Sequence, residues 1–437
     1  RHPGGAARLM LYLLLDRREL LMETGPTMTT TTHGVSTGEN FFAPELIEDP
    51  YPWYAKLRAT DNAYFVSPNQ PDVQVPLLSR YSDVAMALRD PRFGRAGFQK
   101  GAMMALGEGP LSKSYSLWML FRDPPDHTRL RGLVNKAFTP RAVDALRQKI
   151  EALVAELLAK QKGKDSFDLI SQFAYPLPVF VICELLGVPP GDRYRFGAWS
   201  AAIGANFDNL GVADEDLKRR GNEAAEGLTE YFRELVKKRR GQPTDDILQG
   251  LITAEEQGQR LTDDELLATC VLIFFAGHET TVNLIGNGSL ALLRNPGEAQ
   301  RLRQNAALMP GAVEELLRFD SPVQRTGRTV LQDVEVSGRL LHAGERVNVL
   351  VGAANRDPAQ FPDPDRLDVT RANAAAHQSF ASGIHYCVGA PLARLEAQTA
   401  IGALLREAPN LRLATDRPEW RKTFVLRGLV SLPVALS

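Results

Sequence analysis

A run of more than 30 residues between Thr262 and Asn295 constrains the fold more than any other part of the chain. It predicts one long helix, which opens with a capping box formed by Thr262 and Glu265 and stops at Asn295 and Pro296. At 1.5 Å per residue such a helix is about 50 Å long, enough to cross a whole domain. Its first half, LLATCVLIFFAG, is apolar on every side, which is typical of a helix buried in a core.

The remaining pattern predicts a mainly α fold with a small antiparallel β region. Helical spacing dominates from Pro140 to about Gly311, whereas residues 327–358 alternate β-branched and polar residues between glycine and aspartate breaks. The pattern shows no internal repeat and no linker, so we expect a single domain over residues 41–437. Residues 1–40 are expected to be an extension or a disordered N-terminal segment, with Met28 the favoured natural start.

Composition excludes several classes of protein. A net charge of -1 over 437 residues gives no basic excess of the kind that nucleic-acid binding needs. The apolar run LMLYLLL near the N-terminus is far shorter than the roughly 20 residues that span a bilayer, so no membrane anchor is predicted. Three widely spaced cysteines argue against a disulfide scaffold, and we expect a reducing, cytoplasmic compartment.

The long helix is interrupted at AGHETT, residues 276–281, where a glycine, an acid and two threonines break the apolar run. One interpretation is structural: Thr280 bonds back to a carbonyl one turn earlier, and Glu279 faces solvent. The other is functional: Gly277 lets a ligand approach the backbone, and Glu279 and Thr280 together relay protons. The helix alone leaves both open.

A lone cysteine in the glycine-rich loop FASGIHYCVG, residues 380–389, decides between them. Cys387 and His385 could form a nucleophile and base, but residues two apart in an open loop seldom face each other. A thiolate metal ligand fits better. Gly383 and Gly389 would let backbone amides turn toward the sulfur, and the helix that starts just beyond the loop favours a negative ligand at its N-terminus.

At this point the chain resembles the cytochrome P-450 family. The cysteine loop matches the family's signature at Phe380, Gly383, His385, Cys387 and Gly389. Three further motifs follow the family's order: AGHETT on the long helix, EELLR with Glu315 and Arg318, and FPDPDRLD with Arg366. The resemblance extends from about Phe41 to the C-terminus.

The resemblance implies a triangular, mostly helical prism that holds haem b between the long helix and the cysteine loop. Cys387 would ligate the iron, Glu279 and Thr280 would deliver protons to dioxygen, and Ala276 and Gly277 would lie against the cofactor. The haem propionates would be held by the basic residues at the matching motif positions, His127, Arg131, Arg328 and His385. A buried charge network that supports the haem scaffold would consist of Glu315, Arg318 and Arg366.

The activity that the resemblance implies is that of a monooxygenase, which inserts one atom of O2 into a largely apolar small molecule in secondary metabolism or xenobiotic oxidation. Electrons from NAD(P)H would arrive through a ferredoxin and its reductase, which a basic patch of Arg129, Lys136 and Arg394 could dock. Residues 94–120 and 196–217 would cover the substrate, although their apolar side chains could equally pack in the core.

Two alternatives to a monooxygenase differ from it in what they require of the same motifs. A haem-binding sensor or carrier without turnover would need neither Glu279 nor Thr280. A peroxide-driven hydroxylase of this family typically carries Arg-Pro in place of the acid and alcohol, which this chain does not.

Overall fold

The computed structural model describes most of the chain from residue 28 onward. The described residues are 28–31, 34–37, 43–61, 63–67, 70–95, 97, 100, 103, 105–208, 214–244, 246–255, 258–423 and 425–436. Residues 1–27 of the expected extension lie outside this set. Within residues 28–40 of the extension, two strands are formed and the second pairs with β3 in the main sheet.

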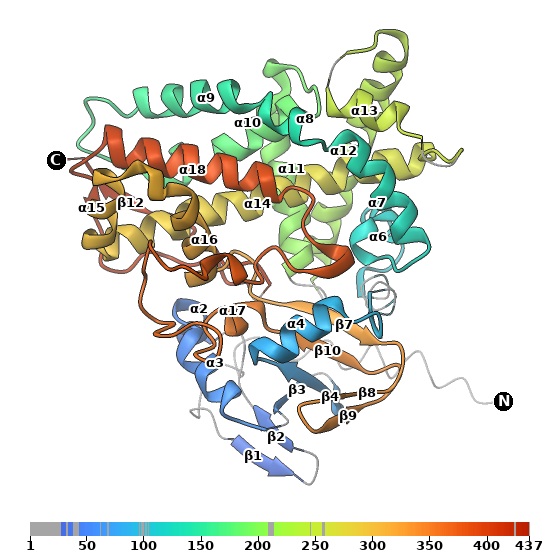
Figure 1. Cartoon of the computed structure of the whole chain (residues 1–437). Coiled ribbons are helices and arrows are strands. Elements are labelled where there is room, and N and C mark those ends of the chain that lie inside the picture. The colour runs from blue at the N-terminus through green and yellow to red at the C-terminus, as the bar shows by residue number, and fades with distance from the viewer. Residues whose placement is uncertain are drawn as a thin grey trace.

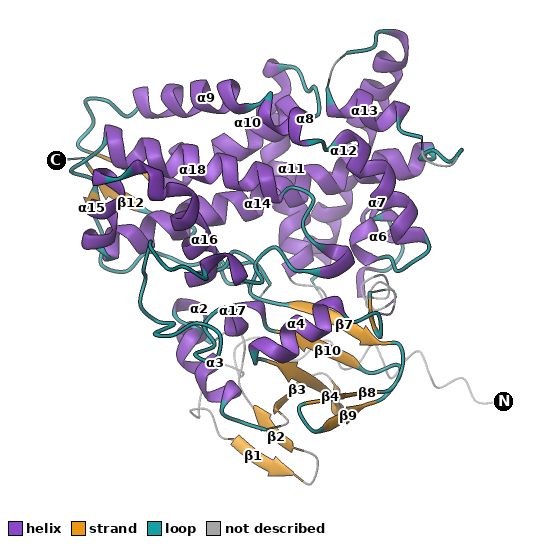
Figure 2. Cartoon of the chain, viewed as in Figure 1, coloured by secondary structure: helices purple, strands orange, loops and turns teal. Residues whose placement is uncertain are grey.

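Helices gather in one part of the molecule and strands in the other (Figures 1 and 2). Several short 3₁₀ turns and one π turn at Ile170–Ala174 connect the helices. The α-helices are α2 (Pro44–Glu48), α3 (Tyr51–Arg58), α4 (Tyr81–Arg89), α6 (Pro110–Leu117), α7 (Asp126–Ala137), α8 (Pro140–Asp144), α9 (Arg147–Ala159), α10 (Pro176–Leu185), α11 (Arg193–Asp208), α12 (Glu215–Gly241), α13 (Ile247–Thr253), α14 (Asp263–Arg294), α15 (Pro296–Gln304), α16 (Met309–Phe319), α17 (Val351–Ala354) and α18 (Ala390–Glu407).

The strands form one large sheet and two small ones. The large sheet has the order β1-β2-β3-β4-β10-β7-β5; the others are β11-β12-β6 and β8-β9. Most pairs are antiparallel, as expected, but β2 with β3 and β10 with β4 are parallel. The strands are β1 (Met28–Thr31), β2 (Gly34–Thr37), β3 (Ala63–Ser67), β4 (Gln70–Leu78), β5 (Phe93–Gly94), β6 (Ser166–Asp168), β7 (Thr326–Val330), β8 (Val334–Val336), β9 (Arg339–Leu341), β10 (Arg346–Val349), β11 (Arg412–Leu413) and β12 (Pro433–Ala435).

The long helix predicted from the sequence is α14, and it forms the centre of the helical part. Thr262 caps it and the reciprocal capping box with Glu265 is present. By length and composition α14 could cross a membrane, but 83% of its most apolar window is buried inside the protein. That burial is the behaviour of a core helix in a folded domain.

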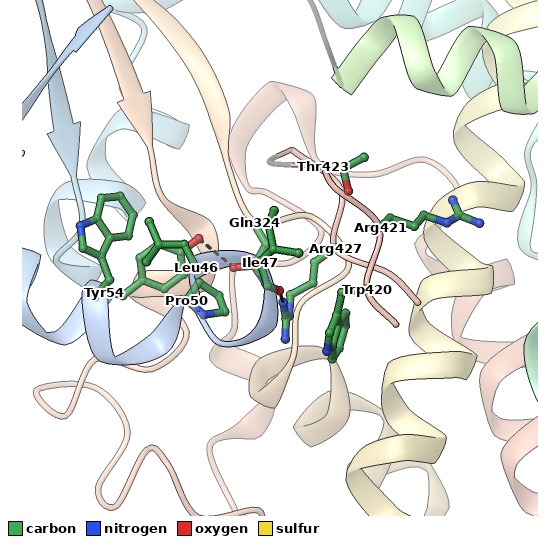
Figure 3. A pocket seen from close by; sticks show the side chains of 10 residues that line it. Leu46, Ile47, Pro50, Tyr54, Gln324, Trp420, Arg421, Thr423 and Arg427 are labelled. Carbon is green, nitrogen blue, oxygen red and sulfur yellow. Dashed lines mark hydrogen bonds between the residues drawn. The ribbon is translucent and has the colours of Figure 1, made fainter. Parts of the chain in front are cut away.

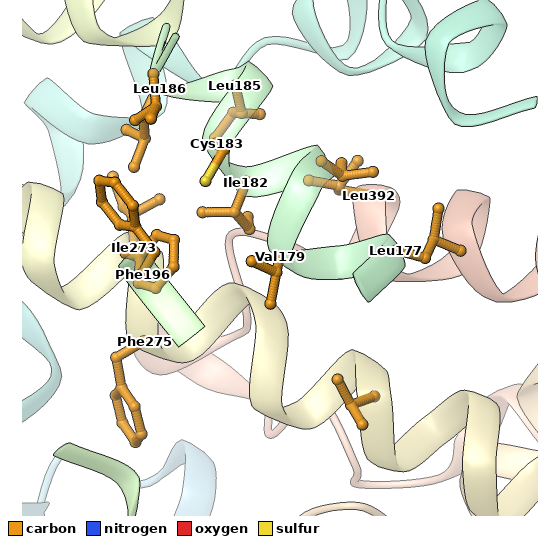
Figure 4. Packing of buried hydrophobic residues seen from close by; sticks show 14 of the residues in the cluster. Leu177, Val179, Ile182, Cys183, Leu185, Leu186, Phe196, Ile273, Phe275 and Leu392 are labelled. Carbon is orange, nitrogen blue, oxygen red and sulfur yellow. The ribbon is translucent and has the colours of Figure 1, made fainter. Parts of the chain in front are cut away.

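The largest apolar cluster surrounds α14 and unites it with α10, α11 and α18 (Figure 4). Ile182 and Cys183 of α10 lie beside Phe196 of α11 and Ile273 of α14, and all four are at most 8% exposed. Each buried side chain of the size of isoleucine or phenylalanine stabilises the fold by about 1.5 to 3 kcal/mol. This packing fixes the helix that carries the AGHETT motif.

Candidate functional site

Cys387 lies in the loop just before α18, and it is accessible, whereas Cys183 and Cys270 are buried. Its backbone N–H donates to the Phe380 carbonyl at 2.9 Å, which closes the loop. Desolvation by the surrounding chain raises the pKa of the thiol, while N–H groups of Gly389 and Ala390 and the charge of Arg131 oppose that rise. These donors stabilise a thiolate, as the sequence predicted for Gly389.

Gly383 serves a different purpose from the one expected. Its φ of +70° is in the region that favours glycine, and a Cβ there would lie 2.7 Å from the carbonyl oxygen of Leu88 in α4. The residue therefore lets the cysteine loop pack on α4. The orientation of the loop depends on this contact.

Two histidines that were predicted to hold the haem propionates lie close together, and one of them belongs to the cysteine loop. The rings of His127, on α7, and His385 have centroids 4.3 Å apart. Nδ1 of His127 and Nε2 of His385 are buried nitrogen atoms without a hydrogen-bond partner among the described residues. Buried polar atoms of this kind normally have a partner, so a bound group with acceptor atoms is expected here.

Arginines complete this basic cluster. Arg328, on β7, is 3% exposed, and its guanidinium donates to the Gly327 carbonyl at 2.9 Å. The sequence analysis missed Arg95, which is 4% exposed and donates to the same carbonyl at 2.7 Å. Only the pairing of β5 with β7 brings Arg95 to this place, and no local motif signals it.

The charges of the cluster act strongly on one another. Burial and the charges of four neighbouring basic residues together lower the pKa of His385 to about 2, with burial the largest cause; the neighbours are His127, Arg328, Arg95 and Arg131. Burial also lowers the pKa of Arg328 to about 10, which Asp123 opposes. The guanidinium groups of Arg95 and Arg328 are buried and that of Arg131 is half-buried, which is costly unless anionic groups join them. The cluster fits the two propionates of haem b, and the accessible thiol of Cys387 fits its iron.

The middle of α14 exposes a short strip of one face. Ala276 is exposed, and Gly277 and Thr280 are half-buried, within a helix that is otherwise buried around them. The Thr280 hydroxyl donates to the Ala276 carbonyl at 3.0 Å. The structural interpretation of AGHETT is therefore right for Thr280, whose hydroxyl is nevertheless accessible to a ligand on this face.

Glu279 does not face solvent. It is 3% exposed, and its Oε2 accepts from Nη1 of Arg421 at 2.5 Å. A Cβ at Gly277 would lie 2.5 Å from Cδ1 of Ile182, so this glycine permits the close approach of α10. Gly277 is half-buried, and the approach of a ligand to it stays a prediction.

The buried charge network is present with one different member. Arg318 donates twice to Glu315, at 2.7 and 2.8 Å, and both side chains are fully buried. The third side chain is Arg371, whose Nε lies 3.1 Å from both oxygens of Glu315. The prediction for Arg366 was wrong: its side chain is 67% exposed and pairs with Asp368. It contributes only its carbonyl, which accepts from Arg371 at 3.0 Å.

Asp208, at the end of α11, is a second acid near Glu279 that the sequence analysis missed. It is 8% exposed, and the Leu426 N–H donates to its Oδ1 at 2.9 Å. Burial raises its pKa to about 7, and the charge of Glu279 adds to the rise, while Arg421 opposes it. Nothing in the local sequence distinguishes this aspartate from exposed ones.

Asp208→Asn is expected to change how stability depends on pH. In the unfolded chain the pKa of Asp208 returns to about 3.9, so the folded state holds the proton more tightly and the free energy of unfolding falls as pH rises from about 4 to about 7. The variant lacks this loss and should be more stable than the wild type at pH 8 by about 4 kcal/mol, with little difference at pH 4. Urea unfolding at both pH values measures this, and an equal difference at both would contradict it.

A pocket of about 380 Å³, part of it open to solvent, lies where the N-terminal helices meet the last segment of the chain (Figure 3). Its lining includes Ile47, Tyr54, Gln324, Trp420 and Arg421. The Arg421 side chain extends from the pocket toward α14, where Glu279 lies. The pocket thus adjoins the acid of the site.

Comparison with known proteins gives a consistent result. The family model described as Cytochrome P450 matches residues 111–408. Cytochrome P450 107B1 of Saccharopolyspora erythraea is 42% identical, over 92% of this chain and 99% of that protein. Vitamin D(3) 25-hydroxylase of Pseudonocardia autotrophica is 40% identical, over 94% of this chain and 99% of that protein. A crystal structure of P450BioI in complex with an acyl carrier protein ligated to hexadec-9Z-enoic acid superposes with a TM-score of 0.82 at 38% identity, covering 90% of this chain and 99% of that one.

Proposed function

The chain belongs to the cytochrome P450 family, and from that premise we propose that it hydroxylates or epoxidises a largely apolar small molecule. Enzymes of this family use haem b, O2 and electrons that come from NAD(P)H through redox partners. The haem, when bound, supplies the activation of O2, and a cysteine thiolate favours cleavage of the O–O bond. The observation that carries the proposal is the accessible Cys387 thiol beside a buried basic cluster, with Glu279 and Thr280 on α14.

Aromatic rings favour an apolar substrate. Trp118 stacks on Phe275 of α14 with centroids 5.6 Å apart, and Phe207 of α11 lies 5.2 Å from the same ring. Trp118 and Phe207 belong to the two segments expected over the substrate, although Trp118 is buried in the core. The other residues of those segments are described only in part. Two relatives support an apolar substrate: one is named a vitamin D(3) 25-hydroxylase, and the other, P450BioI, was crystallised with a fatty acid ligated to an acyl carrier protein.

We also propose that a ferredoxin and its reductase supply the electrons, and that the enzyme works in the cytoplasm, which its unpaired cysteines favour. The expected basic patch is partly neutralised, because Arg129 pairs with Glu265 and Arg394 pairs with Glu314. Lys136 is exposed, and it donates to the uncharged backbone carbonyl of Glu255. Lys136 is therefore our first candidate for ferredoxin docking.

The substrate class can be tested by titration of the ferric holoenzyme. We expect secosteroids such as vitamin D3, or long-chain fatty acids, to shift the Soret band, and hydrophilic compounds of similar size to leave it unchanged. A bound compound should then give a product that carries one oxygen atom from labelled O2. A ligand that binds but acquires no labelled oxygen, in the presence of electron donors, would contradict the proposed activity.

Thr280→Ala is expected to uncouple the reaction. Haem content, substrate binding and NAD(P)H consumption should stay near wild type, because none of these steps needs the hydroxyl proton. The fraction of electrons recovered in product should fall by about tenfold, with hydrogen peroxide rising to match. Product and peroxide are measured in the same reaction.

Thr281→Ala is the matched control for this substitution. Its hydroxyl also bonds a carbonyl one turn earlier, that of Gly277 at 3.1 Å, but the residue is 2% exposed and lies on another face of α14. This variant should keep wild-type coupling. Uncoupling in Thr281→Ala but not in Thr280→Ala would show that the wrong threonine has been assigned.

A further inference from the structure

Asp208 is a buried acid with very few partners. The residue ends α11 and is 8% exposed. The Leu426 N–H donates to Oδ1 at 2.9 Å, and no other group among the described residues forms a hydrogen bond with the carboxyl group. Burying an acid in this way costs stability, which is why Asp208→Asn is expected to be more stable at high pH. A group that the fold keeps at such a cost is a candidate for binding a ligand.

Asp208 lies on the face of α11 that packs over the middle of α14. Gly204 is one helical turn before it, so the two residues share a face of α11. A Cβ at Gly204 would lie 3.5 Å from the ring of Phe275 and 3.7 Å from Oε1 of Glu279. Phe275 directly precedes Ala276, the exposed residue of the strip on α14. The carboxyl group therefore lies one turn along α11 from the accessible part of α14.

Segments that are distant in the sequence bring polar groups close to this acid. Burial raises the pKa of Tyr115, on α6, and the charge of Asp208 adds to the rise. The charges of Glu279, Arg421 and Arg325 act in turn on the pKa of Asp208. Two of the elements that meet here, α6 and α11, belong to the segments expected over the substrate. The acid is therefore placed where a substrate of the proposed monooxygenase would lie.

Aromatic rings lie directly beside Asp208. Phe207 precedes it in the chain, and the ring of Phe207 has its centroid 5.2 Å from that of Phe275 and 6.3 Å from that of Phe121. The ring of Tyr115 lies 6.5 Å from the same phenylalanine. In Figure 4 the Phe275 side chain points away from α10, on the other side of α14. A single acid beside such rings fixes the orientation of a ligand that is otherwise apolar.

The charges around Asp208 favour a neutral hydroxyl group as its partner. Burial raises the pKa of Asp208 to about 7, Glu279 adds to the rise, and Arg421 and Arg325 oppose it. Both forms of the acid therefore occur near neutral pH. A hydroxyl group bonds to either form, because it both donates and accepts. An ammonium group would need the ionised form and would be repelled by the two arginines, whereas a carboxylate would need the protonated form.

We propose that Asp208 is a specificity-determining residue that binds a hydroxyl group of an otherwise apolar substrate. The inference rests on the proposed monooxygenase function and narrows its substrate class. The hydroxyl group donates to Oδ2, while Oδ1 keeps its bond with the Leu426 N–H. The apolar body of the substrate packs on the aromatic rings and extends toward the accessible strip of α14. The substrate is thus held at its hydroxyl end, which determines the carbon atom that lies at the strip.

The test uses probes that bind the haem iron themselves, so the natural substrate need not be known. They are imidazoles with an alkyl tail of increasing length, which ends in a hydroxyl or a methoxy group. Binding is measured by the shift of the Soret band of the ferric holoenzyme at about pH 8, where most of Asp208 is ionised. A hydroxyl group donates to a carboxylate and a methoxy group cannot. At the matching tail length the wild type should therefore bind the hydroxyl probe at least about tenfold more tightly.

Asp208→Asn exchanges an acceptor for a donor at the same place. Its Oδ1 can still accept from the Leu426 N–H, whereas its Nδ2 donates and cannot accept. The preference for the hydroxyl probe should therefore disappear or reverse in this variant. Asp168→Asn is the matched control, because Asp168 also accepts a backbone N–H of the last segment, that of Leu432 at 2.7 Å, but belongs to β6 in a different part of the fold. The control should keep the preference of the wild type.

The inference is overturned if the wild type shows no preference for the hydroxyl probe at any tail length, or if Asp208→Asn keeps that preference. A probe that ends in an ammonium group should bind the wild type less tightly than the hydroxyl probe, and tighter binding would overturn the assignment to a hydroxyl group. None of these results needs turnover. An enzyme that makes no oxygenated product would instead contradict the proposed function, while the affinities still report on Asp208.

Discussion

Cys387→Ser is expected to give a protein that folds and takes up haem but loses the spectrum of a thiolate-ligated haem. The reduced, carbon monoxide-treated wild type should absorb at the red-shifted position that thiolate ligation produces. A serine hydroxyl does not supply the electron density of a thiolate, so this band should disappear. Product formation should fall by at least about a hundredfold, which corresponds to about 2.7 kcal/mol in activation free energy. Visible spectroscopy and product analysis measure the two effects separately.

Cys183→Ala is the matched control, because Cys183 is a buried member of the main apolar cluster. It should keep both the band and the activity, with a small loss of stability from the removed sulfur. Cys387→His should move the band to the position of histidine-ligated haem. A thiolate spectrum that survives in Cys387→Ser would show that another residue holds the iron.

The parts of the fold that the sequence predicted well are those with strong local signals. The bounds of α14 follow from a cap at Thr262, a stop at Asn295 and a long apolar run in the first half of the segment, and the structure has the helix at Asp263–Arg294. The loop of Cys387 was equally clear, since a lone cysteine flanked by glycines and polar residues is unlike the cysteines of apolar core segments. Both predictions depend on residues that are neighbours in the chain.

Contacts between distant segments were not predictable in the same way. Arg95 joins Arg328 only because β5 pairs with β7, and Arg421 reaches Glu279 from 142 residues away. Arginine is common on protein surfaces, so its sequence neighbours do not reveal that it will be buried. The electrostatics of the site therefore depend on residues that no local motif identifies.

Glycines show the same limit. The sequence predicts that a ligand approaches the backbone at Gly277 and that Gly383 lets an amide turn toward the sulfur, and in the structure a Cβ at either position would clash. The groups that a Cβ would meet are Ile182 of α10 and the carbonyl of Leu88 in α4. A glycine indicates a close contact, but only the fold identifies the partner.

Loss of Arg318 is expected to prevent stable assembly. Its guanidinium makes both hydrogen bonds to Glu315 and also donates to the carbonyls of Asn355 and Pro364, at 3.0 and 2.8 Å. Arg318→Ala leaves a fully buried carboxylate with Arg371 as its remaining cation, which costs about 3 to 5 kcal/mol. A domain has only about 5 to 15 kcal/mol in total, so most of the variant should be insoluble or free of haem. Soluble yield and haem absorbance per protein measure this.

Arg371 and Arg366 allow the sharper comparison, because the sequence motif favours Arg366 as the third cation and the structure has Arg371 in that place. Arg371→Ala should lower the free energy of unfolding by about 2 kcal/mol or more, since its side chain is buried on Glu315. Arg366→Ala removes a surface pair with Asp368 and should cost less than about 1 kcal/mol. Arg318→Lys keeps the charge without the bidentate geometry and gives a soluble variant for urea unfolding if Arg318→Ala gives none. A larger loss of stability in Arg366→Ala than in Arg371→Ala would restore the assignment made from the motif.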